Sequence, residues 1–327
     1  MSERKPQLIT PELLGRMPLP QPEEGGDKEE RGRVLVVGGG RETPGAVVLA
    51  GLAALRAGAG KLQIATGEAS APLVAAAIPE ARVFALPETK AGKPSKGAVE
   101  LLAEHAGRAQ AVCVGPGMIE NERVARFVSE VLGLCREVPV VLDAGAIACL
   151  CEGRELLSEL NGRAVVTPNA EEMANIWSVP KEEVTRDAAA SARRAAREYG
   201  AVFALKGRET FIASSGGECL VNRAGSVGLA TSGSGDVLAG VVAGFIARGA
   251  DPLRGAAWGV YVHALAGERL SERVGSLGFL ARELLPEIPA LLDRLSAEGR
   301  AKGGGRGGGR GGGRGGGRGG ERRRGER

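Results

Sequence analysis

Short apolar runs rich in β-branched residues alternate along this chain with longer, Ala-rich amphipathic segments. Because the runs show no polar alternation, each is expected to be a strand covered on both faces, as in a parallel sheet. The expected strands are Val34–Val37, Lys61–Ala65, Arg82–Leu86, Ala111–Val114, Pro139–Leu142, Ala164–Val166 and Val202–Leu205. Strands of this kind separated by helices predict an α/β fold with a mostly parallel central sheet and helices on both faces.

The segments between the strands predict helices, and the chain after the last of these strands predicts a hairpin. Helical patterns cover Ala46–Ala57, Glu122–Cys135 and Lys181–Tyr199, among others. Phe211–Ala213 and Cys219–Asn222 flank a turn of Ser and Gly residues, which is typical of two strands that pair locally. From Val237 to about Ser296 the pattern is helical.

Residues 32–298 are expected to form one domain, because no linker-like stretch interrupts the alternation. Residues 1–31 are rich in Pro, Gly and charge and are expected to be a flexible leader. Residues 299–327 repeat Gly-Gly-Gly-Arg and are expected to be disordered, because they offer almost no apolar surface to bury. Such a tail is either a solvated extension or a segment that makes weak, salt-sensitive contacts with RNA or another polyanion.

The net charge of +4 depends on that tail. Residues 301–327 hold nine basic and two acidic residues, so the rest of the chain carries 34 basic against 37 acidic residues. Aromatic residues make up 3% of the chain, too few for a groove on which bases stack. A mildly acidic body with few aromatic residues argues against a nucleic-acid enzyme.

Cysteine and histidine are scarce. There are five cysteines, none in a Cys-x-x-Cys pair, and two histidines, so no protein-bound metal is expected. His105 and His263 fall in helical segments and are expected to be surface or core residues. The odd number of cysteines and the lack of an apolar signal segment after Met1 predict reduced thiols in a cytoplasmic protein. No apolar stretch reaches the roughly 18 residues of a membrane span, so no membrane association is expected.

The sharpest local signal is the run of small residues Thr231–Gly235, which leads through Asp236 into an apolar helical pattern. Gly233 and Gly235 let the backbone approach a ligand closely, and the N–H groups at a helix start suit a phosphate. No Gly-Lys-Ser or Gly-Lys-Thr follows, so the run is not a P-loop. Asp236 is expected to stay ionised in the first helical turn and to act as a general base toward a hydroxyl. Alternatively, Asp236 only caps the helix.

Residues Gly228–Gly240, with Gly-Ser-Gly-Asp at their centre, resemble the anion-binding and base motif of ribokinase-like enzymes. More narrowly, they resemble ADP-dependent NAD(P)H-hydrate dehydratases. Other stretches similar to that family occur in order at Pro44–Ala46, Ala53–Gly60, Val114–Met118, Leu142–Ala146, Val166–Met173 and Lys206–Thr210. The similarity runs from about Val34 to Leu285 and implies a ribokinase-like fold.

The resemblance implies which residues form the site. Hydrated NADH or NADPH would lie against Ala46, Gly117 and Asn169, and Asp236 would face the substrate hydroxyl as the catalytic base. The adenine nucleotide would be held by Lys206, Gly207, Arg208, Glu209, Thr210, Gly233 and Gly235. The hydroxyl would attack the terminal phosphoryl of ADP, while Mg²⁺ would offset the phosphate charges. Loss of phosphate from the product would return NADH or NADPH and leave AMP.

The resemblance also implies a homotetramer and cooperation with an NAD(P)H-hydrate epimerase. That epimerase is fused ahead of the dehydratase in some relatives, whereas only about thirty residues precede the expected core of this chain. The epimerase is therefore expected on a separate chain.

Two positions depart from the family's pattern. Asn169 stands where the family usually has His, so that a ring contact becomes an amide contact that cannot titrate. Ser226–Gly228 stands where Asn-Pro-Gly is common, which alters the stiffness of the entry to the glycine run. Thr167–Asn169 is alternatively a plain turn from a strand to a helix.

Two other functions stay open. A ribokinase-like kinase that phosphorylates a vitamin-precursor alcohol would share Asp236 and the glycine run. The ordered set Pro44–Ala46, Gly115–Gly117 and Lys206–Thr210 favours the dehydratase over this kinase. A polyanion-binding protein that acts through the Arg/Gly tail would not need an intact glycine run.

Overall fold

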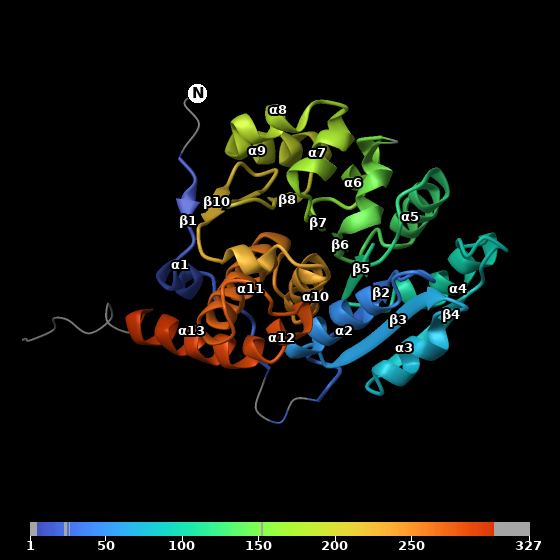
Figure 1. Cartoon of the computed structure of the whole chain (residues 1–327), viewed down its shortest axis with the longest axis horizontal. Helices are drawn as coiled ribbons and strands as arrows, with labels where there is room; N and C mark the ends of the chain where they lie inside the picture. Colours follow the sequence, from blue (N-terminus) through green and yellow to red (C-terminus); the bar gives the residue numbers. More distant parts are fainter. Residues whose placement is uncertain (1–4, 23–24, 26, 152, 304–327) are drawn as a thin grey trace, which may run out of the picture.

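The computed structural model describes residues 5–22, 25, 27–151 and 153–303. Within them, one sheet with the strand order β1-β10-β9-β8-β7-β6-β5-β2-β3-β4 forms the centre of the molecule (Figure 1). Its strands are β1 (Gln7–Leu8), β2 (Arg33–Val37), β3 (Lys61–Gly67), β4 (Ala81–Leu86), β5 (Ala111–Val114), β6 (Val140–Leu142), β7 (Ala164–Val166), β8 (Val202–Leu205), β9 (Thr210–Ala213) and β10 (Cys219–Asn222). Of these strands, β9 alone runs against its neighbours, so the expected mostly parallel sheet and the hairpin are confirmed.

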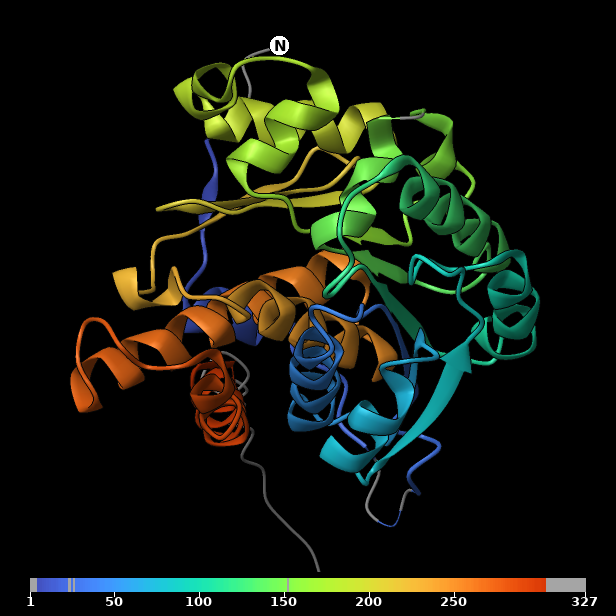
Figure 2. The same cartoon turned by 45° about the vertical axis from the view of Figure 1, so that its right-hand side comes forward.

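Side chains alternate between two hydrophobic cores along the central strands. Val34 and Val36 of β2 point into one core, whereas Leu35 and Val37 point into the other. Helices therefore cover both faces of the sheet, as Figure 2 shows, and this explains why the strands carry no polar alternation.

The first core is shared with α1 (Pro11–Arg16), α2 (Gly45–Arg56), α3 (Ala71–Ala77), α10 (Ser234–Ala247), α11 (Pro252–Arg273), α12 (Ala281–Leu284) and α13 (Glu287–Gly303). The second core is shared with α4 (Lys96–Ala106), α5 (Glu122–Leu134), η1 (Ala144–Cys151), α6 (Glu155–Ser158), α7 (Ala170–Trp177), α8 (Lys181–Arg186) and α9 (Ala188–Tyr199). A short helix, η2 (Val227–Leu229), precedes α10. None of the described helices is both long enough and apolar enough to cross a bilayer.

The expectation of a flexible leader is wrong for residues 5–22. Strand β1 pairs with β10, and Leu14 of α1 is fully buried in the first core. The indole N–H of Trp258 in α11 donates to the carbonyl of Met17 at 2.8 Å. The expectation rested on the Pro-rich and charged composition and overlooked a few well-spaced apolar residues. These residues are enough to pack the segment against α13.

Two helix boundaries also differ from the expected ones. The segment Lys181–Tyr199 is not one helix but two, because Asp187 breaks it and caps α9 by accepting from the N–H of Ala190 at 2.9 Å. Helix α13 continues to Gly303, past the expected domain boundary at 298. The tail from residue 304 onward lies outside the described residues.

The strand order creates an edge suited to ligand binding. The chain moves outward from β2 through β3 to β4, and then pairs β5 with the other side of β2. At such a switch point, the loops that leave the carboxyl ends of two adjacent strands diverge, and α/β proteins bind ligands there. The two loops are residues 38–44, after β2, and residues 115–121, after β5.

Candidate active site

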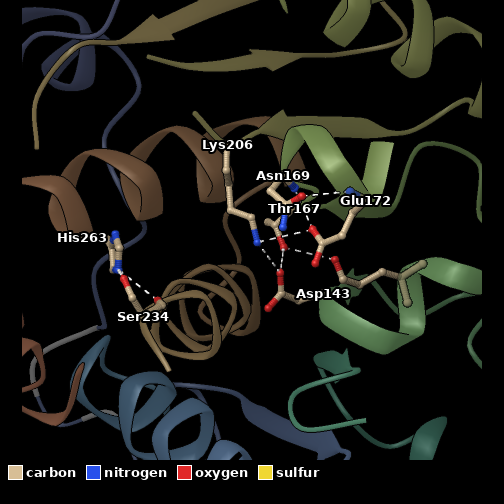
Figure 3. Close-up of polar contacts among 8 residues, drawn as sticks. Asp143, Thr167, Asn169, Glu172, Lys206, Ser234 and His263 are labelled. Atoms are coloured by element: carbon tan, nitrogen blue, oxygen red, sulfur yellow. Dashed lines mark hydrogen bonds and ion pairs between the residues drawn. The ribbon is translucent and has the colours of Figure 1, made fainter. Parts of the chain in front are cut away.

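Three neighbouring strands deliver one polar cluster at the same edge of the sheet. Asp143 follows β6, Thr167 follows β7 and Lys206 follows β8. The Lys206 ammonium donates to Asp143 Oδ1 at 2.9 Å, and Thr167 Oγ1 donates to the same oxygen at 2.7 Å (Figure 3). Asp143 and Thr167 are buried, so these bonds hold the ammonium group in one place.

Asn169 begins α7 as part of a reciprocal capping arrangement. Its Oδ1 accepts from the backbone N–H of Glu172 at 2.9 Å, and the Glu172 carboxylate accepts from the backbone N–H of Asn169 at 2.7 Å. The interpretation of Thr167–Asn169 as a strand-to-helix turn is confirmed. A contact between Asn169 and the substrate stays a prediction.

Lys206 keeps its positive charge because two carboxylates face it. Glu172 Oε2 lies 3.9 Å from Lys206 Nζ, in addition to the closer Asp143. Burial on its own lowers the pKa of the ammonium group, but Asp143 and Glu172 outweigh burial, so the pKa is raised. Burial raises the pKa of the Glu172 carboxyl, whereas Lys206 lowers it. A protonated amine fixed in this way can stabilise charge on a phosphoryl oxygen.

The glycine run lies directly against this cluster. Gly233 is the N-cap of α10 and has a φ of +87°, and a Cβ there would lie 2.5 Å from Leu49 Cδ1, so glycine is required. A Cβ built on Gly235 would lie 3.5 Å from Asp143 Oδ2 and 3.6 Å from Lys206 Nζ. Helix α10 starts without a side-chain cap, and although the Ser234 N–H donates to the Thr231 carbonyl, the next N–H groups, those of Gly235 and Asp236, can face an anion.

Asp236 lies in the first turn of α10 but does not cap it, because Gly233 is the N-cap. The helix-cap interpretation is therefore wrong. The expectation that the helix dipole keeps this carboxyl fully ionised also needs correction. Burial and the nearby Asp143 raise the pKa of Asp236 to about 7, although Lys206 lowers it. A carboxyl that titrates near neutrality is well matched to taking a proton from a hydroxyl.

Ala46 and Gly117, which were expected to line the dinucleotide site, meet at the switch point. Gly117 has a φ of +69°, and a Cβ there would lie 2.7 Å both from Ala46 Cβ and from the carbonyl oxygen of Thr43. Thr43 Oγ1 donates to the carbonyl of Gly117 at 2.7 Å, which joins the loops after β2 and β5. A Cβ on Gly115 would collide with the Asp143 carbonyl, so this pair of loops abuts the polar cluster.

The residues expected to bind the nucleotide divide into two groups. Lys206 points toward Asp143, whereas Gly207, Arg208 and Glu209 form a loop that lines a cleft of about 670 Å³. Residues 184–189, at the junction of α8 and α9, also line this cleft, together with Lys206 itself, Leu205, Phe211 and Ala170. Thr210 begins β9 and is not part of this lining. Gly235 does not line this cleft either, but it lies beside the Lys206 ammonium.

Asp143, Thr167 and Glu172 were not among the expected site residues, although each lies in a stretch that resembles the family. Asp143 and Thr167 directly follow buried strands, and Glu172 is the third residue of the next helix. The carboxyl ends of parallel strands meet at one edge of a sheet. The position of these residues after strands could therefore have identified them as site residues. Their contact with Lys206 also needs the strand order, which the sequence pattern alone does not give.

Comparison with known proteins agrees with this geometry. Residues 34–290 match the family model described as NAD(P)H-hydrate dehydratase. The ADP-dependent (S)-NAD(P)H-hydrate dehydratase of Xanthomonas campestris is 46% identical over 297 residues, which cover 90% of this chain and 99% of the relative. The Bacillus subtilis protein of the same name is 32% identical, over 85% and 95% of the two chains. A bifunctional NAD(P)H-hydrate repair enzyme of Moorella thermoacetica is 36% identical, but the match covers 53% of its length.

Solved structures give the same result for the fold. A ribokinase-like superfamily protein from Enterococcus faecalis superposes with a TM-score of 0.78 at 25% identity, over 90% of this chain and 98% of the other. The Bacillus subtilis ADP/ATP-dependent NAD(P)H-hydrate dehydratase co-crystallised with ATP/Mg²⁺ superposes with a TM-score of 0.75 at 29% identity, over 89% and 99%. Since fold, motif order and identity agree along nearly the whole described domain, this chain belongs to the NAD(P)H-hydrate dehydratase family and has the ribokinase-like fold.

Proposed function

We propose that this chain repairs hydrated NADH and NADPH by removing water from them, with ADP as the phosphoryl donor and AMP and phosphate as by-products. The observation that carries the proposal is the meeting of the glycine run with the Lys206–Asp143 pair, beside a carboxyl, Asp236, that titrates near neutrality. The relatives named ADP-dependent (S)-NAD(P)H-hydrate dehydratase support both the reaction and the co-substrate.

The first step is transfer of a phosphoryl group. Asp236 accepts the proton of the hydroxyl on the reduced nicotinamide ring, and the hydroxyl oxygen bonds to the terminal phosphorus of ADP. The bond from that phosphorus to the bridging oxygen breaks, and AMP leaves with the electron pair. The first N–H groups of α10 and the Lys206 ammonium face the charge that develops on the phosphoryl oxygens.

The second step is elimination. Hydroxide is a poor leaving group and phosphate is a good one, so the first step converts a difficult elimination into an easier one. The ring nitrogen supplies electrons as the carbon–oxygen bond breaks and phosphate departs with the bonding pair. Loss of a proton from the adjacent ring carbon to the departing phosphate restores the double bond.

The cleft between residues 184–189 and the 207–209 loop is our candidate for the adenine nucleotide. Its volume of about 670 Å³ is in the usual range for sites that bind small ligands. The cleft's lining holds three basic residues, Arg186, Lys206 and Arg208, against two acidic ones, Asp187 and Glu209. Lys206 lines the cleft and Gly235 lies beside Lys206, so we assign the terminal phosphate to this place, where it would meet Asp236.

The hydrated ring is assigned to the switch point, between the Thr43–Ala46 and Gly115–Gly117 backbones. Gly115 and Gly117 have no side chains, so the hydrated ring, which is puckered at its saturated carbons, can approach the backbone there. Asn169, the N-cap of α7 after β7, offers a neutral amide whose Oδ1 is already engaged by the backbone N–H of Glu172; β6 separates β7 from the switch-point strand β5. Any contact it makes with the substrate is therefore assigned to its amide N–H groups.

A magnesium ion fits the donor set if the nucleotide supplies most of its ligands. The described residues contain no group of three His, Cys, Asp or Glu side chains that could hold a metal ion. Asp143 and Glu172 both face Lys206, and two carboxylates beside phosphates are a usual setting for Mg²⁺. We assign these two carboxylates as its protein ligands. When bound, the ion would offset phosphate charge.

The wider setting is also proposed. We assign the protein to the cytoplasm, as a homo-oligomer of four subunits. The epimerase reaction is assigned to a separate chain, because relatives matched over nearly their whole length carry the dehydratase name alone, whereas the relative matched over 53% of its length is bifunctional.

The direct test mixes purified protein with hydrated NADH, ADP and Mg²⁺. Recovery of nicotinamide absorbance should match the AMP formed, one for one, and omission of ADP should abolish both. A parallel reaction with hydrated NADPH gives the substrate preference. Release of AMP without recovery of absorbance, or accumulation of a stable phosphorylated alcohol, would contradict the dehydratase and favour a kinase.

A further inference from the structure

His263 contacts the start of the helix that carries the glycine run, although it belongs to another helix. It lies on α11, and its ring Nε2 is 3.0 Å from the carbonyl oxygen of Ser234 and 3.0 Å from Ser234 Oγ (Figure 3). Ser234 is the first residue of α10 and precedes Gly235. Both side chains are buried, with 8% of His263 and 5% of Ser234 exposed.

The contact determines which ring nitrogen carries the proton. A carbonyl oxygen can only accept a hydrogen bond, so Nε2 of His263 must be the donor. Burial lowers the pKa of the ring to about 4; the bond to Ser234 and the negative charge of Asp143 oppose this shift, whereas Lys206 adds to it. The ring is therefore neutral at physiological pH, with hydrogen on Nε2 and none on Nδ1.

Few hydrogen bonds hold the first turn of α10 from outside. In the part of the chain that the structure describes, the two His263 contacts are the hydrogen bonds that tie residues 230–236 to a side chain of another segment. The other hydrogen bonds of this run join backbone groups close in sequence, such as the N–H of Ser234 to the carbonyl of Thr231 at 3.2 Å. A Cβ added at Gly233 would meet the apolar side chains of Leu49 and Ala281 first.

We propose that His263 is a positioning residue for phosphoryl transfer, which acts by holding Ser234 and thereby fixing the first turn of α10. That turn carries the N–H groups and the Asp236 carboxyl that meet the phosphoryl group. The inference rests on the proposed function for the role of those groups. Positioning matters greatly here, because a displacement of about 1 Å in a catalytic arrangement can reduce the rate by roughly 10²-fold.

Two substitutions separate positioning from simple packing. His263→Leu fills the space but removes the donor, whereas His263→Gln places an amide N–H near the position of Nε2. We expect His263→Leu to raise the KM for ADP and lower kcat, together by about 10–100-fold in kcat/KM, and His263→Gln to recover most of the loss. The KM for the hydrated dinucleotide should change less.

The chain supplies its own matched control, because it contains only two histidines. His105 lies on α4 and stacks on Phe84 in the other core, with ring centroids 4.0 Å apart. His105→Leu should lower the melting temperature without altering either KM. If both Leu variants lowered the melting temperature and neither altered the kinetics, His263 would be a packing residue and the proposal would be wrong.

A second measurement does not depend on catalysis. In His105→Leu protein, the ring ¹⁵N signals come from His263 alone, and they should report the neutral Nε2–H form between about pH 6 and pH 8. An Nδ1–H form would overturn the proposal. ADP affinity, measured by calorimetry, should fall in His263→Leu and recover in His263→Gln even if the hydrate proved not to be the substrate. Failure of the proposed function and failure of this inference are therefore distinguishable.

Discussion

Lys206 Nζ and Asp143 Oδ1 lie 2.9 Å apart at the carboxyl edge of the sheet, although 63 positions separate these residues in the sequence. Both affect the carboxyl of Asp236, in opposite directions. Asp143 adds to burial in raising its pKa, and Lys206 lowers it, with about 7 as the result. Burial is the largest influence, and the pair adjusts the pH at which the base becomes available.

This balance predicts the pH dependence of turnover. The base must be ionised, so kcat/KM for the hydrated dinucleotide should rise with pH through about 7 and then level off. Lys206→Met removes the charge that lowers the pKa, so the rise should move to higher pH. Asp143→Asn removes a charge that raises the pKa, so the rise should move to lower pH. Movement of both variants in the same direction would contradict the assignment.

Replacement of the base itself separates catalysis from stability. Asp236→Asn should reduce kcat by about 10²–10⁴-fold, the usual contribution of a general base, while ADP still binds. Near-normal turnover in this variant would remove the basis for the mechanism.

The same variant should be more stable than the parent at neutral pH. Because the pKa of Asp236 rises from 3.8 in the unfolded chain to about 7 in the folded one, the folded state binds more protons across this window. The parent therefore loses stability as pH rises from about 4 to about 7, and Asp236→Asn does not incur that loss. His263 has the opposite dependence in the same window but is present in both proteins, so the difference between their unfolding free energies isolates Asp236.

The central strands could be predicted because every one of them is buried on both faces, which leaves an uninterrupted apolar run such as Val34–Val37. Short elements that are ordered only by packing against distant parts of the chain could not be predicted. Strand β1 and helix α1 are ordered by β10 and α13, which lie about two hundred residues or more along the chain. The composition of residues 5–22 does not show that β10 and α13 pack against them, and so this segment was expected to be flexible.

The candidate site also has features that the sequence predicted and features that it did not. The sequence identified Gly233, Gly235 and Asp236 as site residues. Small residues at a helix start allow a ligand to approach the backbone, and a carboxyl beside them can serve as a base. The pKa of Asp236 was not predictable, because it depends on burial and on Asp143, which arrives from another strand. The position of Asp143 beside Lys206 follows from the adjacency of β6, β7 and β8, a property of the sheet and not of either motif.

The docked N-terminal segment predicts a measurable contribution to stability. Leu14 is fully buried between α1 and its neighbours, so Leu14→Ala should reduce the free energy of unfolding by about 2–5 kcal/mol. Leu73, on α3, has 63% of its surface exposed and provides the control. Leu73→Ala should change stability by less than about 0.5 kcal/mol. Equal effects of the two substitutions in denaturant melts would show that residues 5–22 are not part of the folded core.

Removal of the Arg/Gly tail should leave the enzyme intact. A protein that ends at Gly303 keeps every element of the sheet and the site, so its kcat and both KM values should equal those of the full chain. Binding to heparin at low salt should weaken, because the tail holds most of the unbalanced basic residues. A full-length control with the tail arginines replaced by serine should behave like the shortened protein. Loss of turnover on truncation would assign the tail to the site or the fold.

The switch point offers the sharpest test of where the dinucleotide binds. At Gly117 a new Cβ would lie 2.7 Å from Ala46 Cβ and from the Thr43 carbonyl oxygen, so Gly117→Ala must push the loops after β2 and β5 apart. We expect the KM for the hydrated dinucleotide to rise at least about tenfold, since displacing a substrate-binding surface by about 1 Å can weaken catalysis by that much or more. The KM for ADP should change little, because the proposed nucleotide cleft lies beside β8 and β9.

Gly162 provides the matched control for this substitution. It also has a positive φ, +79°, but a Cβ there would meet no atom within 4 Å. Both Ala variants therefore incur the backbone cost of a left-handed residue, about 1–2 kcal/mol, and Gly117→Ala alone adds the collision. A rise in the hydrate KM for Gly117→Ala but not for Gly162→Ala would support the ring position assigned here. A rise in the ADP KM instead would place the nucleotide, and not the hydrate, between Ala46 and Gly117.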